Sequence, residues 1–141
     1  MEELAMEENK IRQRHEIPVE DTWAIEDLYA TDAAWEAELQ TLAADQEYMV
    51  GFAGQLSESG EKLYTYLERM EQVNAKAELL ANYCMRKSDE DTREAKYQAM
   101  SGRFTSVYVE ISTACSFDTP EIMALSNEAL EGFYAACPQL E

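Results

Sequence analysis

The sequence predicts an all-α domain: a helical bundle built on a long antiparallel helix hairpin, with an extended N-terminal arm and short C-terminal helices. The 141 residues include only five Gly and three Pro, too few for the many tight turns of a small β protein. Apolar residues also recur at alternating spacings of three and four over two long stretches, which is the repeat of packed helices. The length fits one domain with its own hydrophobic core.

The N-terminal part is expected to be a leader followed by an arm. Residues 1–13 are polar and carry no periodic apolar stripe, so we expect a disordered leader there. Pro18 disfavours helix at Ile17, and the mixed apolar residues that follow predict an extended arm lying against the body. The side chains expected to anchor this arm are Trp23, Ile25, Leu28 and Tyr29.

The first helix is predicted from about residue 32 to residue 48. Thr31 can cap free backbone N–H groups, and Asp32 places a carboxylate near the positive end of the helix. Gly51 and Gly54 then break the helical pattern. The apolar face of this helix is expected to consist of Trp35, Leu39, Leu42 and Ala43.

The next two stretches predict the hairpin. A polar interval at 87–91 separates two apolar seams, so two helices of about 26 residues are expected to pack antiparallel. Cys84 and Cys115 then lie at opposite ends of the hairpin, too far apart for a disulfide, and are expected to pack in the core. The first seam consists of Leu63, Tyr66, Met70, Val73, Ala77, Leu80 and Cys84. The second consists of Tyr97, Met100, Phe104, Val107, Ile111 and Ala114.

Two short helices are predicted to complete the chain. Thr119 provides a capping hydroxyl for the first, with Pro120 at its first helical position, where the missing N–H costs nothing. Ser126 opens the second, and Pro138 should end it. The apolar residues of this last helix are Leu130, Phe133 and Tyr134.

The charge of the chain excludes two classes of partner. Against 29 Asp and Glu there are 11 Lys and Arg, a net charge of −18, which repels nucleic acid and anionic membranes. The start of the chain does not resemble a signal peptide, and no apolar run approaches the ~20 residues that span a bilayer. Three widely spaced cysteines fit a reducing compartment. We therefore expect a cytoplasmic protein that binds neither nucleic acid nor membranes.

The residues themselves predict no catalytic, cofactor-binding or metal-binding site. His15 is the single histidine and Glu16 follows it, but Val19 stands where a zinc-binding His-Glu-x-x-His motif needs its second histidine. The acids at 89–91 lack the glycine and closing glutamate of a calcium loop, and are interpreted as a connector and helix cap. Glycine-rich phosphate loops and Cys–His pairs are also absent from the sequence.

Several strings resemble the opening of oligoendopeptidase F, a thimet-oligopeptidase-like zinc metallopeptidase. These are Asp21-Thr22-Trp23, Asp27-Leu28-Tyr29, and then Asp32 and Trp35. Later strings resemble the helical N-terminal domain of the same family and fall in the right order: Asp91-Thr92, Ser116-Phe117 and Pro120-Glu121-Ile122. Ala30 departs from the Pro often found after the aromatic residue. The resemblance implies that residues 14–141 are the helical N-terminal domain of an oligoendopeptidase whose catalytic domain is absent.

In function, the resemblance implies a noncatalytic domain that walls the substrate channel, so that only short unfolded peptides reach the active site. Its implied partners are the catalytic domain of the same polypeptide and the oligopeptide substrates of the parent enzyme. Zinc is expected in the missing catalytic domain, this chain has no cofactor of its own, and alone it is expected to be inactive. The alternative is an independent helical protein-interaction module. A reading frame that continues into a His-Glu-x-x-His motif would decide for the peptidase.

A weak homodimer of the isolated domain is also expected. Large residues off the two seams need not all be covered when the catalytic domain is absent, and exposed apolar patches favour self-association. Because the net charge opposes this, association should strengthen as salt rises. The off-seam residues in question are Tyr64, Leu67, Leu79, Tyr83 and Tyr108.

Overall fold

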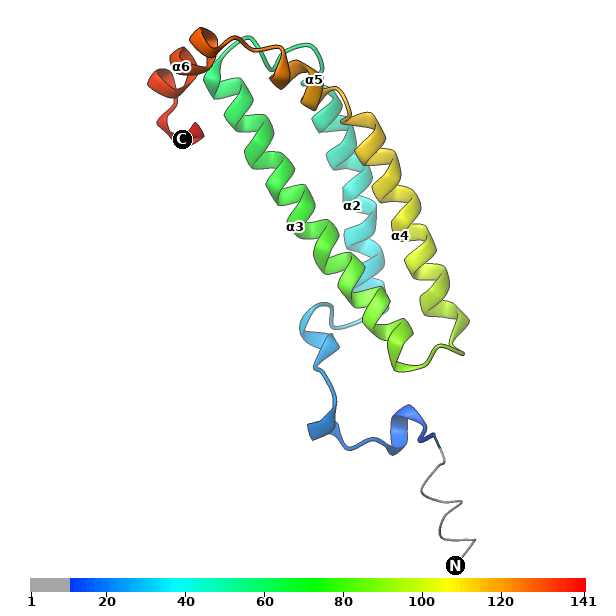
Figure 1. Cartoon of the computed structure of the whole chain (residues 1–141). Helices are drawn as coiled ribbons and strands as arrows, with labels where there is room; N and C mark the ends of the chain where they lie inside the picture. Colours follow the sequence, from blue (N-terminus) through cyan, green and yellow to red (C-terminus); the bar gives the residue numbers. More distant parts are fainter. Residues whose placement is uncertain (1–10) are drawn as a thin grey trace, which may run out of the picture.

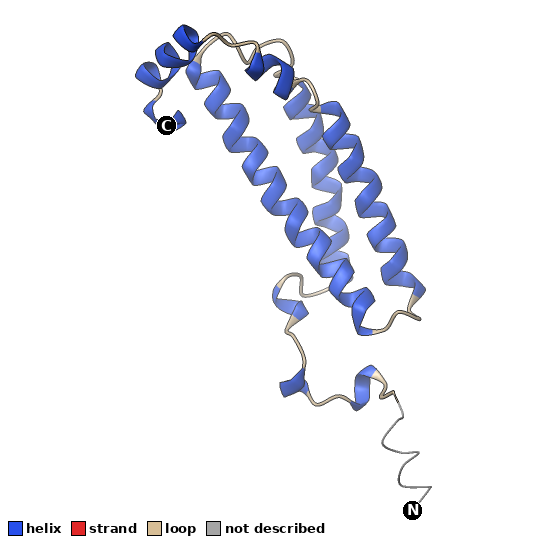
Figure 2. Cartoon of the chain, viewed as in Figure 1, coloured by secondary structure: helices blue, strands red, loops and turns tan. Residues whose placement is uncertain are grey.

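The computed structural model describes residues 11–141, and three long helices form its body (Figure 1). These are α2 (Asp32–Val50), α3 (Gly60–Glu90) and α4 (Ala95–Ala114), which pack side by side in alternating directions. The described residues also form short helices α5 (Asp118–Met123) and α6 (Asn127–Ala136), and the 3₁₀ turns η1 (Arg14–Glu16), η2 (Val19–Asp21), η3 (Ile25–Asp27) and η4 (Pro138–Leu140). None of residues 11–141 lies in a strand (Figure 2), which confirms the all-α class.

Side-chain caps start three of the helices. The Thr31 hydroxyl accepts the Ala34 N–H at 3.1 Å and opens α2, and the Ser126 hydroxyl opens α6 in the same way, as predicted. Ser59 does so for α3. Helix α5 begins at Asp118, one residue before the predicted capping residue Thr119. The predicted hydroxyl cap is therefore wrong, because the Asp118 carboxylate accepts the Thr119 N–H instead.

The core forms where the seams of α3 and α4 meet the apolar face of α2. Trp35 is fully buried, and its indole N–H donates to the Leu80 carbonyl at 2.8 Å, which ties α2 to α3. Ala43 is exposed, so its predicted place in the core is wrong; Asp45 and Met49 continue the buried face of α2 instead. The buried seam residues of the hairpin are Leu63, Tyr66, Val73, Ala77, Leu80, Cys84, Met100, Phe104 and Ile111. The other predicted seam residues, Met70, Tyr97, Val107 and Ala114, are half-buried.

The hairpin is antiparallel as predicted, but its helices are unequal. α3 has 31 residues and α4 has 20, because α3 continues through the polar interval to Glu90. Ion pairs one turn apart, Arg86–Asp89 at 2.9 Å and Lys87–Glu90 at 3.5 Å, support that last turn. The connection is only 91–94, and α4 has no side-chain cap, so the predicted capping role of the acids at 89–91 is wrong.

All three cysteines, Cys84, Cys115 and Cys137, are free and buried. This confirms that Cys84 and Cys115 pack in the core rather than pair with each other. No helix in the described part of the chain is long and apolar enough to cross a membrane.

The N-terminal arm differs from the extended segment that was predicted. Three 3₁₀ turns shape it, and the Thr22 hydroxyl closes η2 by donating to the Val19 carbonyl at 2.7 Å. Ile25 is buried, and Leu28 and Tyr29 pack against the core as predicted. Trp23 does not anchor the arm to the body as predicted, because 72% of its surface is exposed. Most of the predicted leader, residues 1–10, lies outside the described residues.

Candidate functional site

The described part of the chain contains no set of side chains that could bind a metal ion. Among residues 11–141, no three His, Cys, Asp or Glu side chains are grouped so that they could hold a metal ion. His15 lies in η1, where it is exposed. The described residues therefore offer no ligand cluster for a metal ion, and the resemblance itself places zinc in the catalytic domain.

The one buried charged side chain among the described residues, Asp45, joins α2 to α3. Its carboxylate lies 2.5 Å from an Arg69 guanidinium nitrogen and 2.6 Å from the Lys76 ammonium. Lys76 also donates to the Thr41 hydroxyl at 2.9 Å. Because both carboxylate oxygens have charged donors, this cluster fixes the angle between two helices rather than holding a free acid or base.

At the end of the bundle where α5 lies, which we call the base, Tyr66 and Glu121 hold the turns around this helix. The buried Tyr66 hydroxyl donates to the Asp118 carboxylate at 3.0 Å, and burial followed by this hydrogen bond raises the pKa of Tyr66. The Glu121 carboxylate accepts backbone N–H groups of Gly54 at 2.5 Å and of Leu56 at 3.2 Å. These groups close the loop between α2 and α3, so their role is structural.

A shallow pocket of about 380 Å³ lies between α3 and α4 near this base. Apolar atoms of Met70, Ile111 and Cys115 line part of it, and hydroxyl, amide and carboxylate groups line the rest. These polar residues are Asn74, Tyr108, Ser112, Ser116, Asp118 and Thr119. Such a mixture can bind a short polar segment, but it contains no nucleophile paired with a base.

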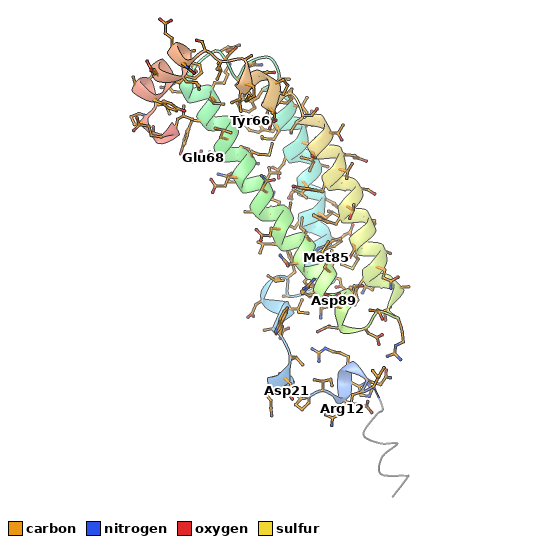
Figure 3. The ribbon with its side chains drawn as sticks, viewed as in Figure 1. Arg12, Asp21, Tyr66, Glu68, Met85 and Asp89 are labelled. Carbon is orange, nitrogen blue, oxygen red and sulfur yellow. The ribbon has the colours of Figure 1, made fainter. Side chains whose placement is uncertain are left out.

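At the opposite end, the arm and the last turn of α3 line a second cavity of about 360 Å³, which is open to solvent. Figure 3 marks its two walls by Asp21 on the arm and Asp89 on α3. The other lining residues are Arg14, Ile17, Thr22, Trp23, Ile25, Arg86 and Glu90. Sequence reasoning missed this cavity, although its Asp21-Thr22-Trp23 wall is a string that resembles the peptidase family.

The off-seam residues divide into two groups. Leu67, Leu79 and Tyr108 are 40–45% exposed, so part of the apolar surface stays uncovered as expected. Tyr83 is buried, because its hydroxyl donates to Asp32 at 2.7 Å and its ring packs against Tyr29. Tyr64 is half-buried. None of these residues lies beside a metal-ligand cluster in the described part of the chain.

Comparison with known proteins supplies the context. No protein-family model matches the chain. Oligoendopeptidase F (plasmid) of Lactococcus lactis subsp. cremoris is 36% identical over 118 residues, which are 83% of this chain and 20% of that protein. Oligopeptidase PepF of Bacillus subtilis is 29% identical over 125 residues, 89% of this chain and 19% of that protein.

A solved structure shares the fold. The crystal structure of oligoendopeptidase-F from Enterococcus faecium superposes with a TM-score of 0.69 at 24% identity, covering 78% of this chain and 22% of that one. This chain thus spans about a fifth of the length of these relatives. Over most of its described length, it matches the N-terminal region of the oligoendopeptidase F family.

Proposed function

We propose that this chain serves as the noncatalytic N-terminal helical domain of a peptidase, over residues 14–141. The observation that carries the proposal is a match across most of this chain to about a fifth of proteins named as oligopeptidases. The described residues supply no metal-ligand cluster, so the chemistry would reside elsewhere in the polypeptide. The remaining length of the relatives leaves room for a catalytic domain in the same chain.

In this proposal the domain walls the substrate channel, so that only short unfolded peptides reach the active site. Rigidity supports the role: α3 alone is about 46 Å long at 1.5 Å per residue, and its seam is buried against two neighbouring helices. The Asp45 cluster and the indole of Trp35 fix α2 against α3. A helical bundle held rigid in this way can exclude bulky substrates without contributing a reacting group.

The same proposal covers the cofactor, the substrates and the location of the whole enzyme. Zinc would be bound by the catalytic domain, oligopeptides would be the substrates of the whole enzyme, and the protein would be cytoplasmic. The weak, salt-promoted homodimer of the isolated chain stays a prediction, which sedimentation equilibrium at low and high salt tests. A strict monomer at both salt concentrations would count against it and would favour the alternative of an independent interaction module.

A chimera tests the wall directly. In the Lactococcus lactis oligoendopeptidase F, the region matched by this chain is replaced by residues 14–141. We expect the chimera to cleave a short quenched peptide and to discriminate against the same sequence placed inside a long unfolded protein. A zinc-loaded chimera that cleaves both equally fast would contradict the proposal. Unmodified oligoendopeptidase F is the control for the discrimination of the parent.

A further inference from the structure

The N-terminal arm is an arch that is fixed at both ends. At its start, Arg14 pairs with Glu90 at 2.9 Å, and Arg93 donates to the Gln13 side chain at 2.6 Å. At its end, Ile25 is buried and the Tyr29 ring meets Tyr83 edge-on at 5.6 Å. The segment between these attachments and the last turn of α3 line the cavity.

The middle of this arch turns its largest apolar side chains outward. Val19 is 83% exposed and Trp23 is 72% exposed, whereas Trp35 in the core is fully buried. Local hydrogen bonds to the Pro18 and Val19 carbonyls close η2 and set the shape of the arm here. Exposed tryptophan is uncommon on a monomer surface and is the residue most enriched at the energetic centre of interfaces.

The arm also carries one sign of charge. Residues 16–27 include five Asp and Glu and no Lys or Arg. Glu20, Asp21, Glu26 and Asp27 are exposed and lie on both sides of Trp23 in the sequence. An apolar centre with an acidic rim is complementary to an apolar surface with a basic rim. A second copy of this chain would bring the same acids against these acids, so a two-fold pairing through the arm is disfavoured.

The residues that line the cavity beneath the arch indicate which groups could contact a docked segment. Arg86 contributes a buried Nε–H that has no hydrogen-bond partner. Asp21, Asp89 and Glu90 line the same cavity together with Arg14 and Arg86, and two of these acids are paired, Glu90 with Arg14 and Asp89 with Arg86. The Arg86 Nε–H has almost no exposed surface and is closed to a docked group, whereas Ile17 and Ile25 offer an apolar contact in the cavity.

We propose that residues 16–27 dock the domain onto a basic-rimmed apolar surface of the catalytic part of the same polypeptide. Trp23 is the anchor of this interface. The inference rests on the proposed function, because it takes its partner from there. It adds which face of the domain makes the contact and which chemistry the partner face must carry.

Hydroxyl-radical footprinting tests the contact residue by residue. We compare the oxidation rate of Trp23 in the 141-residue chain and in the chimera, with buried Trp35 as the folding control and exposed Met123 as the reactive control. Trp23 should become about tenfold less reactive in the chimera, as expected for full burial in an interface core. Equal reactivity in a chimera that keeps Trp35 protected would overturn the inference. So would protection of Trp23 in the isolated chain that rises with its concentration, because a second copy would then be the occupant.

Binding in trans provides a second test that does not depend on the folding of the chimera. The Lactococcus lactis protein without its matched region is titrated with this chain. Trp23→Ala should weaken binding by about thirtyfold, and Met123→Ala, a change at an exposed residue of α5, should leave it within about twofold. Equal effects of the two substitutions would contradict the anchor role.

Neutralising the acids of the arm distinguishes a local contribution of these acids from the effect of the overall negative charge. Neutralising Glu20, Asp21, Glu26 and Asp27 should weaken binding and flatten its salt dependence, because these charges face the basic rim. The matched control neutralises four exposed acids elsewhere: Glu47, Glu110, Glu128 and Glu131. If both quadruple variants behave alike, the arm is not the interface. Failure of the proposed function would show differently, as loss of length discrimination by a chimera whose Trp23 is protected.

Discussion

Single residues show where burial dictates the chemistry of this domain. Asp45 is 5% exposed and satisfied by two cations from α3. Asp45→Ala should lower the free energy of unfolding by about 1–3 kcal/mol, because two donors lose their acceptor while remaining partly hydrated. The control is Glu58→Gln, which weakens the more exposed pair with Lys62 and should cost about 0–0.5 kcal/mol. Urea unfolding measures both, and equal costs would contradict the account.

Gly60 is a second position where burial limits the choice of side chain, because an added Cβ would clash with a neighbouring helix. A Cβ there would lie 2.8 Å from the Phe133 carbonyl oxygen and 3.0 Å from its Cα, which are backbone atoms of α6. Gly60→Ala should therefore destabilise the docking of α6 by about 1–3 kcal/mol. Gly102 lies in α4, where a Cβ would meet nothing within 4 Å, so Gly102→Ala should stabilise by about 0.5–1 kcal/mol. Thermal unfolding should show shifts of opposite sign; the same sign for both would refute this.

Residue-level prediction from the sequence succeeded where a local rule applied and failed where tertiary geometry intervened. The hydroxyls of Thr31 and Ser126 cap their helices because that bond spans only three residues. Trp23 was expected to be buried because it is large and apolar, yet the turn closed by Thr22 directs the arm outward. The cavity and its unpartnered Arg86 Nε depend on residues far apart in sequence, which no local pattern reveals.

At the scale of elements, the alternating seam of α3 predicts which side chains hold the hairpin. Leu80 is fully buried, so Leu80→Ala should cost about 2–5 kcal/mol, including the cavity it leaves. Leu79 precedes it on the same helix but is 45% exposed, and Leu79→Ala should cost less than about 1 kcal/mol. Chemical denaturation followed by circular dichroism compares the two. Similar losses would mean that the seam is wrongly assigned.

The contacts between elements also make the fold sensitive to alkali. Burial, with a further contribution from Glu38, raises the pKa of Tyr29 to about 12. Burial and hydrogen bonds to Asp118 and Asp32 likewise raise the pKa of Tyr66 and Tyr83. A folded-state pKa above the unfolded value of about 10 means full stability below pH ~10, lost progressively as pH rises toward 12. Urea unfolding across this range should show the decline. Tyrosinate absorbance that titrates fully near pH 10 in the folded protein would contradict it.

Element boundaries were harder to predict than element types. The seam period identified two antiparallel helices, but the polar stretch 87–91 was interpreted as a connector. Ion pairs across one turn, Arg86–Asp89 and Lys87–Glu90, make that polar stretch a stable end of α3. Polarity alone therefore does not end a helix when its charges can pair along the surface.

For the whole molecule, the helix periodicity predicted the fold, and the family resemblance predicted the relatives. Both were confirmed, by the helical bundle and by matches to oligoendopeptidase F over most of this chain. Composition could not predict the arch at the N-terminus, since each of its attachments, Arg14 to Glu90 and Tyr29 to Tyr83, joins residues that are far apart in the sequence. The proposed docking surface therefore depends on the structure, whereas the proposed lack of catalysis follows from the sequence.

The most direct test of the central claim uses the 141-residue chain alone. With one histidine and no grouped ligands in the described residues, it should retain no stoichiometric zinc after dialysis and should not cleave a quenched oligopeptide. Metal analysis of the dialysed protein and a peptide-turnover assay measure both, with a zinc-loaded full-length relative as the positive control. A full equivalent of zinc that survives dialysis, together with turnover by the purified chain, would contradict the account.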